Sequence, residues 1–169
     1  MEYKLKSISQ SGIAEANAKA EFYRLLNEPE ETESICQDVL AVDAENQDAL
    51  RIRGLALTDQ FNGSPDDRYA EAEDIFRQLS DPYERSYYTG LLYERRAKAQ
   101  LLAGRPPHTL AVLLEEAMRA FEAAEKLRPK GNDDAILRWN RCVRIFESHA
   151  ESEWRQPAAA FEAGDIHSF

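Results

Sequence analysis

The sequence predicts an all-α protein made of helical hairpins stacked in a row. Good helix formers dominate the chain of 169 residues, which contains only 7 Gly and 7 Pro. A small residue followed three positions later by a large one also recurs about every three dozen residues. The three pairs are Ala20 and Tyr23, Gly54 and Leu57, and Gly90 and Tyr93. Repeats of this length are typical of stacked helical hairpins.

A second pattern marks the partner helix of each hairpin. It consists of a small residue, a large one four positions later, and a small or medium one three positions after that, so that all three share a helix face. Its members are Thr32, Cys36 and Val39, then Ala72, Phe76 and Leu79, then Ala117, Phe121 and Ala124. Small residues allow two helices to approach closely, and each hairpin then leaves an apolar edge that the next hairpin covers.

In chain order, we expect the first hairpin over residues 14–46 and the second from residue 47, with a turn-rich loop at 61–68. The third has helices at 83–103 and 109–127, joined by a Gly- and Pro-containing stop signal. A last helix within 131–148 has no partner and is expected to cap the stack. Residues 1–12 form an N-terminal extension, residues 13–148 the repeat domain, and residues 149–169 a flexible acidic tail.

These patterns resemble the tetratricopeptide repeat (TPR) family, whose 34-residue motif has small residues at positions 8 and 20 and large ones at 11 and 24. The first unit fills these places with Ala20, Tyr23, Thr32 and Cys36, the second with Gly54, Leu57, Ala72 and Phe76, and the third with Gly90, Tyr93, Ala117 and Phe121. Lys19 and Arg53 depart from the motif, because the family prefers Leu there. The resemblance covers about residues 13–146. It implies a right-handed α-solenoid of about three hairpins and a C-terminal capping helix, with a concave groove lined by the first helix of each hairpin.

The sequence carries no motif typical of an enzyme or a metal site. GxGxxG, GxxxxGK[ST], GxSxG and HExxH are all absent, Cys36 and Cys142 are far apart, and the three His are scattered. We therefore expect no catalytic activity, no cofactor and no metal. Both cysteines are expected to be reduced and packed on helix faces.

Charge is distributed unevenly along the chain, whose formal net charge is −10. Residues 1–82 carry 8 Lys and Arg against 18 Asp and Glu, whereas residues 83–146 carry 12 against 8. An acidic chain repels nucleic acid and anionic lipid, so neither is expected as a partner, while the basic segment can attract an acidic protein. No apolar stretch is long enough to span a membrane, and no apolar run follows the N-terminal lysines, which favours a cytoplasmic protein.

We therefore expect a non-catalytic interaction module that holds an acidic, extended peptide or protein segment in the groove. Tyr and Arg are the residue types that most often anchor interfaces. In the register that the TPR resemblance implies, the groove residues are Arg51, Leu55, Tyr87, Tyr88, Leu91 and Arg95, joined by Arg138 and Arg141 of the capping helix.

Several alternatives stay open. The tyrosines can serve packing between helices, and the arginines at 138–144 can pair with acids of the preceding helix, which are Glu115, Glu116, Glu122 and Glu125. The acidic half of one chain can dock on the basic half of another, which would give a self-assembling scaffold and a homo-oligomer. The acidic tail can also lie in its own groove as a competitor.

Overall fold

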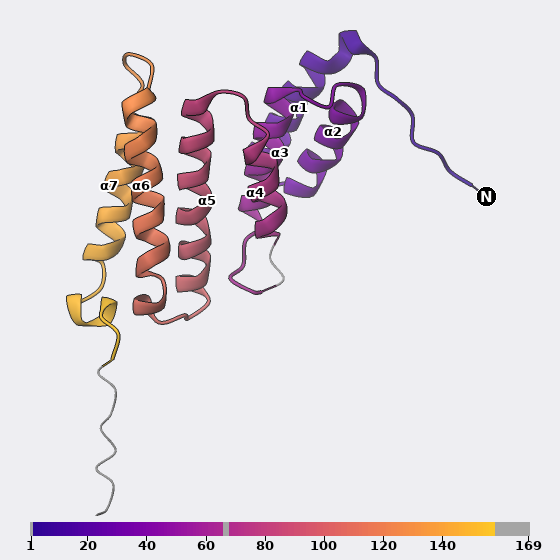
Figure 1. Ribbon diagram of the computed structural model, residues 1–169. Helices are drawn as coiled ribbons and strands as arrows, with labels where there is room; N and C mark the ends of the chain where they lie inside the picture. The colour runs from indigo at the N-terminus through magenta and orange to yellow at the C-terminus, as the bar shows by residue number, and fades with distance from the viewer. Residues whose placement is uncertain (1, 66–67, 158–169) are drawn as a thin grey trace, which may run out of the picture.

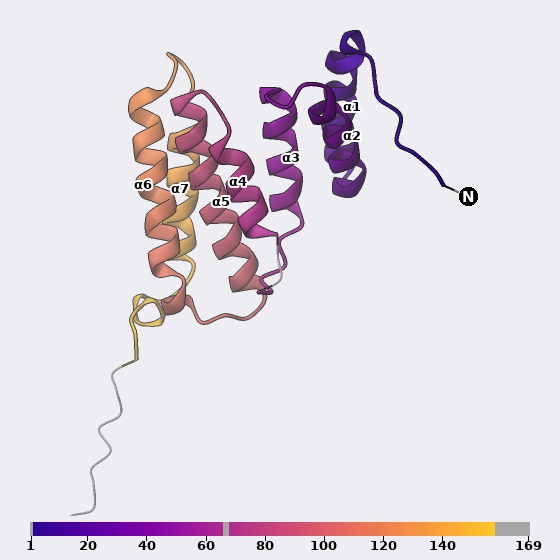
Figure 2. The ribbon, with the colours of Figure 1, turned by 45° about the vertical axis from the view of Figure 1, so that its right-hand side comes forward.

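The computed structural model describes residues 2–65 and 68–157, and these residues contain α-helices and short 3-10 turns but no strand. The α-helices are α1 (Ile13–Leu25), α2 (Pro29–Val42), α3 (Gln47–Asp59), α4 (Tyr69–Arg77), α5 (Pro82–Leu102), α6 (Ala111–Leu127) and α7 (Asp134–Glu147). The 3-10 helices are η1 (Gln10–Gly12), η2 (Pro107–Thr109) and η3 (Glu151–Trp154). Each α-helix packs antiparallel to the next, and the helices follow one another across the molecule from α1 to α7 (Figures 1 and 2).

Local sequence signals set where several helices begin and end. The Asn46 side chain accepts a hydrogen bond from the Ala49 amide at 3.0 Å and so caps α3, and Asp81 does the same for the Tyr83 amide at the start of α5. Gly104 adopts a φ of +85° just after α5, a backbone conformation that favours glycine. The helix expected from residue 109 begins two residues later, because η2 occupies the position before it.

The recurrent small residues are the points at which the two helices of each hairpin meet, as the sequence predicted. A Cβ atom added to Gly54 would lie 2.3 Å from the Phe76 ring, and one added to Gly90 would lie 2.6 Å from the Phe121 ring. In the first hairpin, the Thr32 hydroxyl donates a hydrogen bond of 3.1 Å to the carbonyl of Ala20. The aromatic rings of α4 and α6 therefore occupy the space that the missing side chains leave on α3 and α5.

The hydrophobic core continues from one hairpin to the next. One cluster surrounds Phe76 between α3 and α4, and another surrounds Phe121 between α5 and α6 and reaches Cys142 of α7. Leu55 and Tyr88 pack against both clusters and so join them. Alternate helices also touch, because α1 contacts α3, α3 contacts α5, and α5 contacts α7. None of the described helices is both long and apolar enough to span a membrane.

The ordered structure extends beyond the expected end of the repeat domain at residue 148. Residues 151–154, which the sequence assigned to the tail, form η3 and pack on α7 through Trp154. The Trp154 indole donates a hydrogen bond of 2.8 Å to the carbonyl of Phe146, and the two rings lie 4.7 Å apart. A single short turn has no helical periodicity, which is why the pattern missed it. Residues 158–169 of the expected tail lie outside the described residues, and so does the expected contact of the tail with the groove.

The close contact at Gly54 predicts that Gly54→Ala destabilises the protein despite the better helix propensity of alanine. The added methyl group would overlap the Phe76 ring. Overpacking of a core costs ~1–3 kcal/mol, which exceeds the gain of up to ~1 kcal/mol from replacing a helical glycine. We expect urea denaturation to show a lower free energy of unfolding. Gly54→Ala combined with Phe76→Leu should lose less than the sum of the two single losses, and strictly additive losses would contradict the contact.

Both cysteines are predicted to be unreactive in the folded protein. Cys36 and Cys142 have no exposed surface, and burial raises the pKa of each thiol to about 12. The thiolate is the reactive species, so a chromogenic disulfide reagent at pH 8 should react at the rate of unfolding. Both thiols should react at once in denaturant, and fast reaction of either thiol under native conditions would show that this packing is wrong.

Candidate functional site

A cleft of about 580 Å³ opens on the side of the molecule formed by the first helix of each hairpin. Helices α1, α3 and α5 contribute most of its wall, and the start of α7 closes one side. Four predicted groove residues lie together in this cleft: Arg51, Leu55, Tyr87 and Tyr88. Helix residues spaced by three or four positions share a face, so each first helix can present one row of side chains to the cleft.

Aromatic rings form the α5 wall of the cleft. The ring centroids of Tyr83 and Tyr87 lie 5.9 Å apart, and those of Tyr87 and Tyr88 lie 5.1 Å apart. Tyr88 also stacks on Phe76 at 5.2 Å, so it serves the core as well as the cleft. Burial raises the pKa of Tyr88 to about 12, against the opposing effect of Arg51. The wall is therefore a neutral surface of hydroxyl-bearing rings.

Charges on the α3 wall of the cleft are largely compensated. The Nε atom of Arg51 lies 3.1 Å from Oε1 of Glu84, and its Nη1 atom lies 3.0 Å from a carboxylate oxygen of Asp48. Asn17 of α1 is buried, and its amide nitrogen donates to Asn46 at 3.0 Å. Its Oδ1 atom is buried without a hydrogen-bond partner among the described residues. The carboxylates of Glu21 and Asp134 also line the cleft, so acids outnumber Arg51 there.

A second hollow of about 350 Å³ adjoins the cleft on the side of α7. Tyr87 and Asp134 border both hollows, so the two lie side by side, and we call them together the groove. The other residues of the second hollow are Leu137, Arg138, Arg141 and Arg144. The predicted residues Arg138 and Arg141 therefore lie in the same groove as the tyrosines, at its basic end.

A fully buried carboxylate lies beneath this basic end. The Glu94 side chain is 0% exposed, and its Oε1 atom lies 3.5 Å from Nη1 of Arg138 and 3.9 Å from Nζ of Lys98. Neither carboxylate oxygen accepts a hydrogen bond from the described residues. Burial lowers the pKa of Lys98. The negative charge of Glu94 raises this pKa, and the positive charges of Arg141 and Arg138 lower it further. We call Lys98 and Arg138, which lie against Glu94, together with Arg141 of the second hollow, the cationic pocket.

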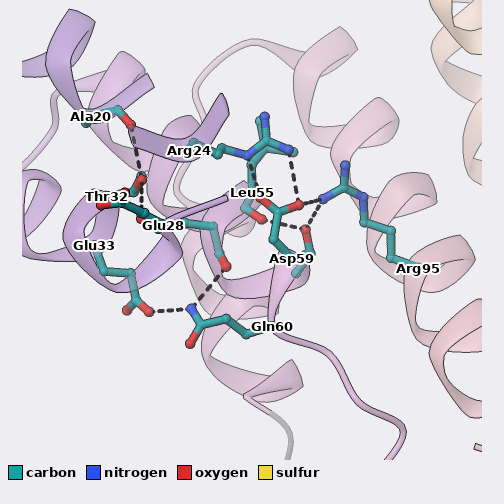
Figure 3. Close-up of polar contacts among 11 residues, drawn as sticks. Ala20, Arg24, Glu28, Thr32, Glu33, Leu55, Asp59, Gln60 and Arg95 are labelled. Atoms are coloured by element: carbon teal, nitrogen blue, oxygen red, sulfur yellow. Dashed lines mark hydrogen bonds and ion pairs between the residues drawn. The ribbon is translucent and has the colours of Figure 1, made fainter. Parts of the chain in front are cut away.

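Arg95 has a structural partner. Its Nη1 atom lies 2.5 Å from Oδ1 of Asp59 and 2.6 Å from the Thr58 hydroxyl, while Nε of Arg24 lies 2.7 Å from Oδ2 of the same Asp59 (Figure 3). Asp59 therefore links α1, α3 and α5. Arg95 was predicted as a groove residue, but its guanidinium is held in this bridge, because α3 presents a carboxylate opposite it.

Leu91 needs a second correction. It is 2% exposed and belongs to the core cluster around Phe121, because its face of α5 points toward α6 and α7. The alternative that Arg138 pairs with acids of α6 is also wrong, since its partner is Glu94 of α5. Lys98 was not predicted. Its spacing of four residues from Glu94 was the signal that could have placed it, because residues at this spacing are neighbours on a helix.

Comparison of the chain with protein-family models, with curated proteins and with solved structures finds no match. Among the described residues, no group of three or more His, Cys, Asp or Glu side chains is arranged to hold a metal ion. The groove and its charges are therefore the features that bear on function.

The Asp59 bridge predicts that Asp59→Asn destabilises the stack. The change leaves Arg24 and Arg95 without their shared carboxylate, and both guanidinium groups are mostly buried. Leaving buried charged groups without a partner costs ~1–3 kcal/mol, which urea denaturation would measure. Asp74→Asn is the matched control, because Asp74 pairs with Arg77 on the open surface of α4 and such pairs contribute ~0–1 kcal/mol. Equal losses in the two variants would contradict a bridging role for Asp59.

Proposed function

We propose that the chain is a TPR-like, right-handed α-solenoid that acts as a non-catalytic protein-interaction module. It binds an acidic, extended segment of another protein in the groove. The observation that carries this proposal is that the tyrosine-lined cleft and the second hollow, which contains Arg138, Arg141 and Arg144, lie side by side and share Tyr87 and Asp134. Helical hairpins joined at recurrent small residues, with alternate helices in contact, support the TPR-like architecture.

An acidic partner is favoured by the charge at the α7 end of the groove. The cleft itself is lined by one cation, Arg51, and by four carboxylates, those of Glu21, Asp48, Glu84 and Asp134. At the α7 end, three arginines line the hollow with one carboxylate, that of Asp134, and Arg138 also lies against the buried Glu94. Arginine presents a planar fork of donors that fits a carboxylate with two hydrogen bonds, so this end of the groove suits anionic side chains.

An extended segment is favoured by the shape and lining of the groove. The cleft crosses three successive first helices and continues onto a fourth, so it is longer than a single side chain requires. Ile52 and Leu55 offer apolar contacts at its base, and the tyrosine rings offer rigid area for the ligand's side chains.

A non-catalytic role is supported by the chemistry of the groove. The described polar residues that line it are tyrosines, carboxylates, amides and arginines. The thiols of Cys36 and Cys142, which would be the strongest nucleophiles, are buried and have pKa values raised to about 12 by that burial. A thiol in this state neither attacks a substrate nor exchanges disulfides.

Charge reversal at the basic end tests the groove. Arg138→Glu combined with Arg141→Glu should weaken the binding of fluorescein-labelled peptides rich in Asp, Glu and Leu by about 10- to 100-fold, measured by fluorescence anisotropy. Affinity for the wild-type protein should fall as salt rises, because the attraction is screened. Arg77→Glu combined with Arg119→Glu is the control. It changes the net charge by the same amount as the groove variant, but the two residues lie on α4 and α6, outside the groove.

Two outcomes would overturn this assignment. Equal weakening by the groove variant and its control would mean that net charge alone matters, and binding that is insensitive to salt would exclude an acidic ligand. Light scattering at low and high salt tests the self-assembling scaffold. Oligomers that dissociate in salt would favour docking between acidic and basic halves of different copies, whereas a monomer at all salt concentrations would reject it.

A further inference from the structure

We propose that the cationic pocket of Lys98, Arg138 and Arg141 binds a phosphoryl group carried on a Ser, Thr or Tyr side chain of the peptide ligand. This inference rests on the proposed function, and it specifies the anionic group that the basic end of the groove recognises. Three features of the pocket support it: the cations that lie against Glu94, the number of cations, and the position of Tyr87.

The pocket is built with its negative charge sealed inside and its positive charges partly exposed, those of Arg138 and Arg141 in the second hollow. Lys98 and Arg138 approach the same oxygen of Glu94 from the outside, at 3.9 and 3.5 Å. Glu94 is 0% exposed, whereas the side chains of Lys98 and Arg138 are 38% and 34% exposed. Arg141 is exposed and forms no ion pair within the described part of the chain. Glu94 thus holds two cations in place from below without saturating their donors.

The number of cations matches a phosphoryl group better than a carboxylate. Three cations over one carboxylate leave two positive charges in excess, whereas a phosphorylated side chain carries about −1.5 to −2 at pH 7. Its three free oxygens can give each of the three cations an acceptor of its own. A ligand carboxylate has two oxygens and one charge, so it would leave one cation unmatched.

The surroundings of the pocket support the same assignment. Arg138 and Tyr87 line the same basic hollow, and Tyr87 also borders the cleft. A phosphorylated residue on the cations therefore places its neighbours in the ligand against the tyrosine wall. Lys98 has a pKa lowered by burial and by Arg141 and Arg138, and a bound dianion would remove this repulsion. Arg95 does not take part, because Asp59 holds it.

Three peptides of one acidic sequence that differ at a single position test the proposal. That position carries phosphoserine, Ser or Glu, and binding to the intact protein is measured by fluorescence anisotropy. We expect the phosphoserine peptide to bind at least about tenfold more tightly than the Glu peptide, because the additional charge and oxygen engage a third cation. Inorganic phosphate should compete with it more strongly than acetate does at matched ionic strength.

Variants locate the phosphoryl group. Arg141→Ala and Lys98→Met should each reduce the preference for phosphoserine over Glu to less than about threefold, whereas the control Arg119→Ala should leave it unchanged. Thermal unfolding would confirm that the variants fold. Arg141→Ala decides the matter if Lys98→Met does not fold, since Arg141 is exposed.

The outcomes separate this inference from the proposed function. Equal affinity for the phosphoserine and Glu peptides would overturn the phosphoryl site and leave the acidic-peptide groove standing. A preference that survives Arg141→Ala would place the phosphoryl group elsewhere and would also overturn the inference. Failure of all three peptides to bind would overturn the inference together with the proposed function.

Discussion

The close approach of paired helices at Gly54 and Gly90 is the constraint on which the rest of the structure depends. Phe76 and Phe121 fill the space that a side chain at each glycine would need. Because each ring lies directly against the backbone of the partner helix, it fixes both the separation and the rotation of that helix. The rotation decides which residues of α3 and α5 face the core and which face the groove. The groove is therefore a consequence of how the hairpins pack.

The contacts between hairpins combine apolar and charged groups. Leu55 and Tyr88 join the two large core clusters, and Asp59 connects the first helices of all three hairpins through Arg24 and Arg95. An apolar contact can slide, whereas ion pairs held at 2.5 to 2.7 Å define one register between the helices. Partly buried ion pairs add little net stability, so their main effect here is on the alignment of the groove walls.

Sequence patterns predicted the helices and their crossing points well, because both depend on local spacing. The register that the TPR resemblance implied placed Arg51, Leu55, Tyr87 and Tyr88 on one side of the molecule, and all four line the cleft. The partner of Arg95 could not be predicted from local spacing. Asp59 lies 36 residues earlier and meets Arg95 only when α3 and α5 are side by side. Leu91 was misplaced because it lies where the two faces of α5 meet, and a shift of one position there moves a side chain from groove to core. Trp154 acts within a single turn, which has no period to detect.

The two boundaries between first helices differ in their charge balance, and this difference gives the groove its direction. Between α3 and α5, acids and bases are matched, because Arg51 meets Glu84 and Arg95 meets Asp59. Between α5 and α7, cations outnumber acids, because the buried Glu94 lies against Lys98 and Arg138, and Asp134 lines the hollow with three arginines. A charge left uncompensated where two helices meet raises the free energy of the unliganded protein, and a bound anion removes that cost. In the proposed function, the packing that builds an aromatic cleft at one boundary provides an anion site at the next, and a ligand that satisfies both carries its negative charge beside a side chain that stacks on tyrosine.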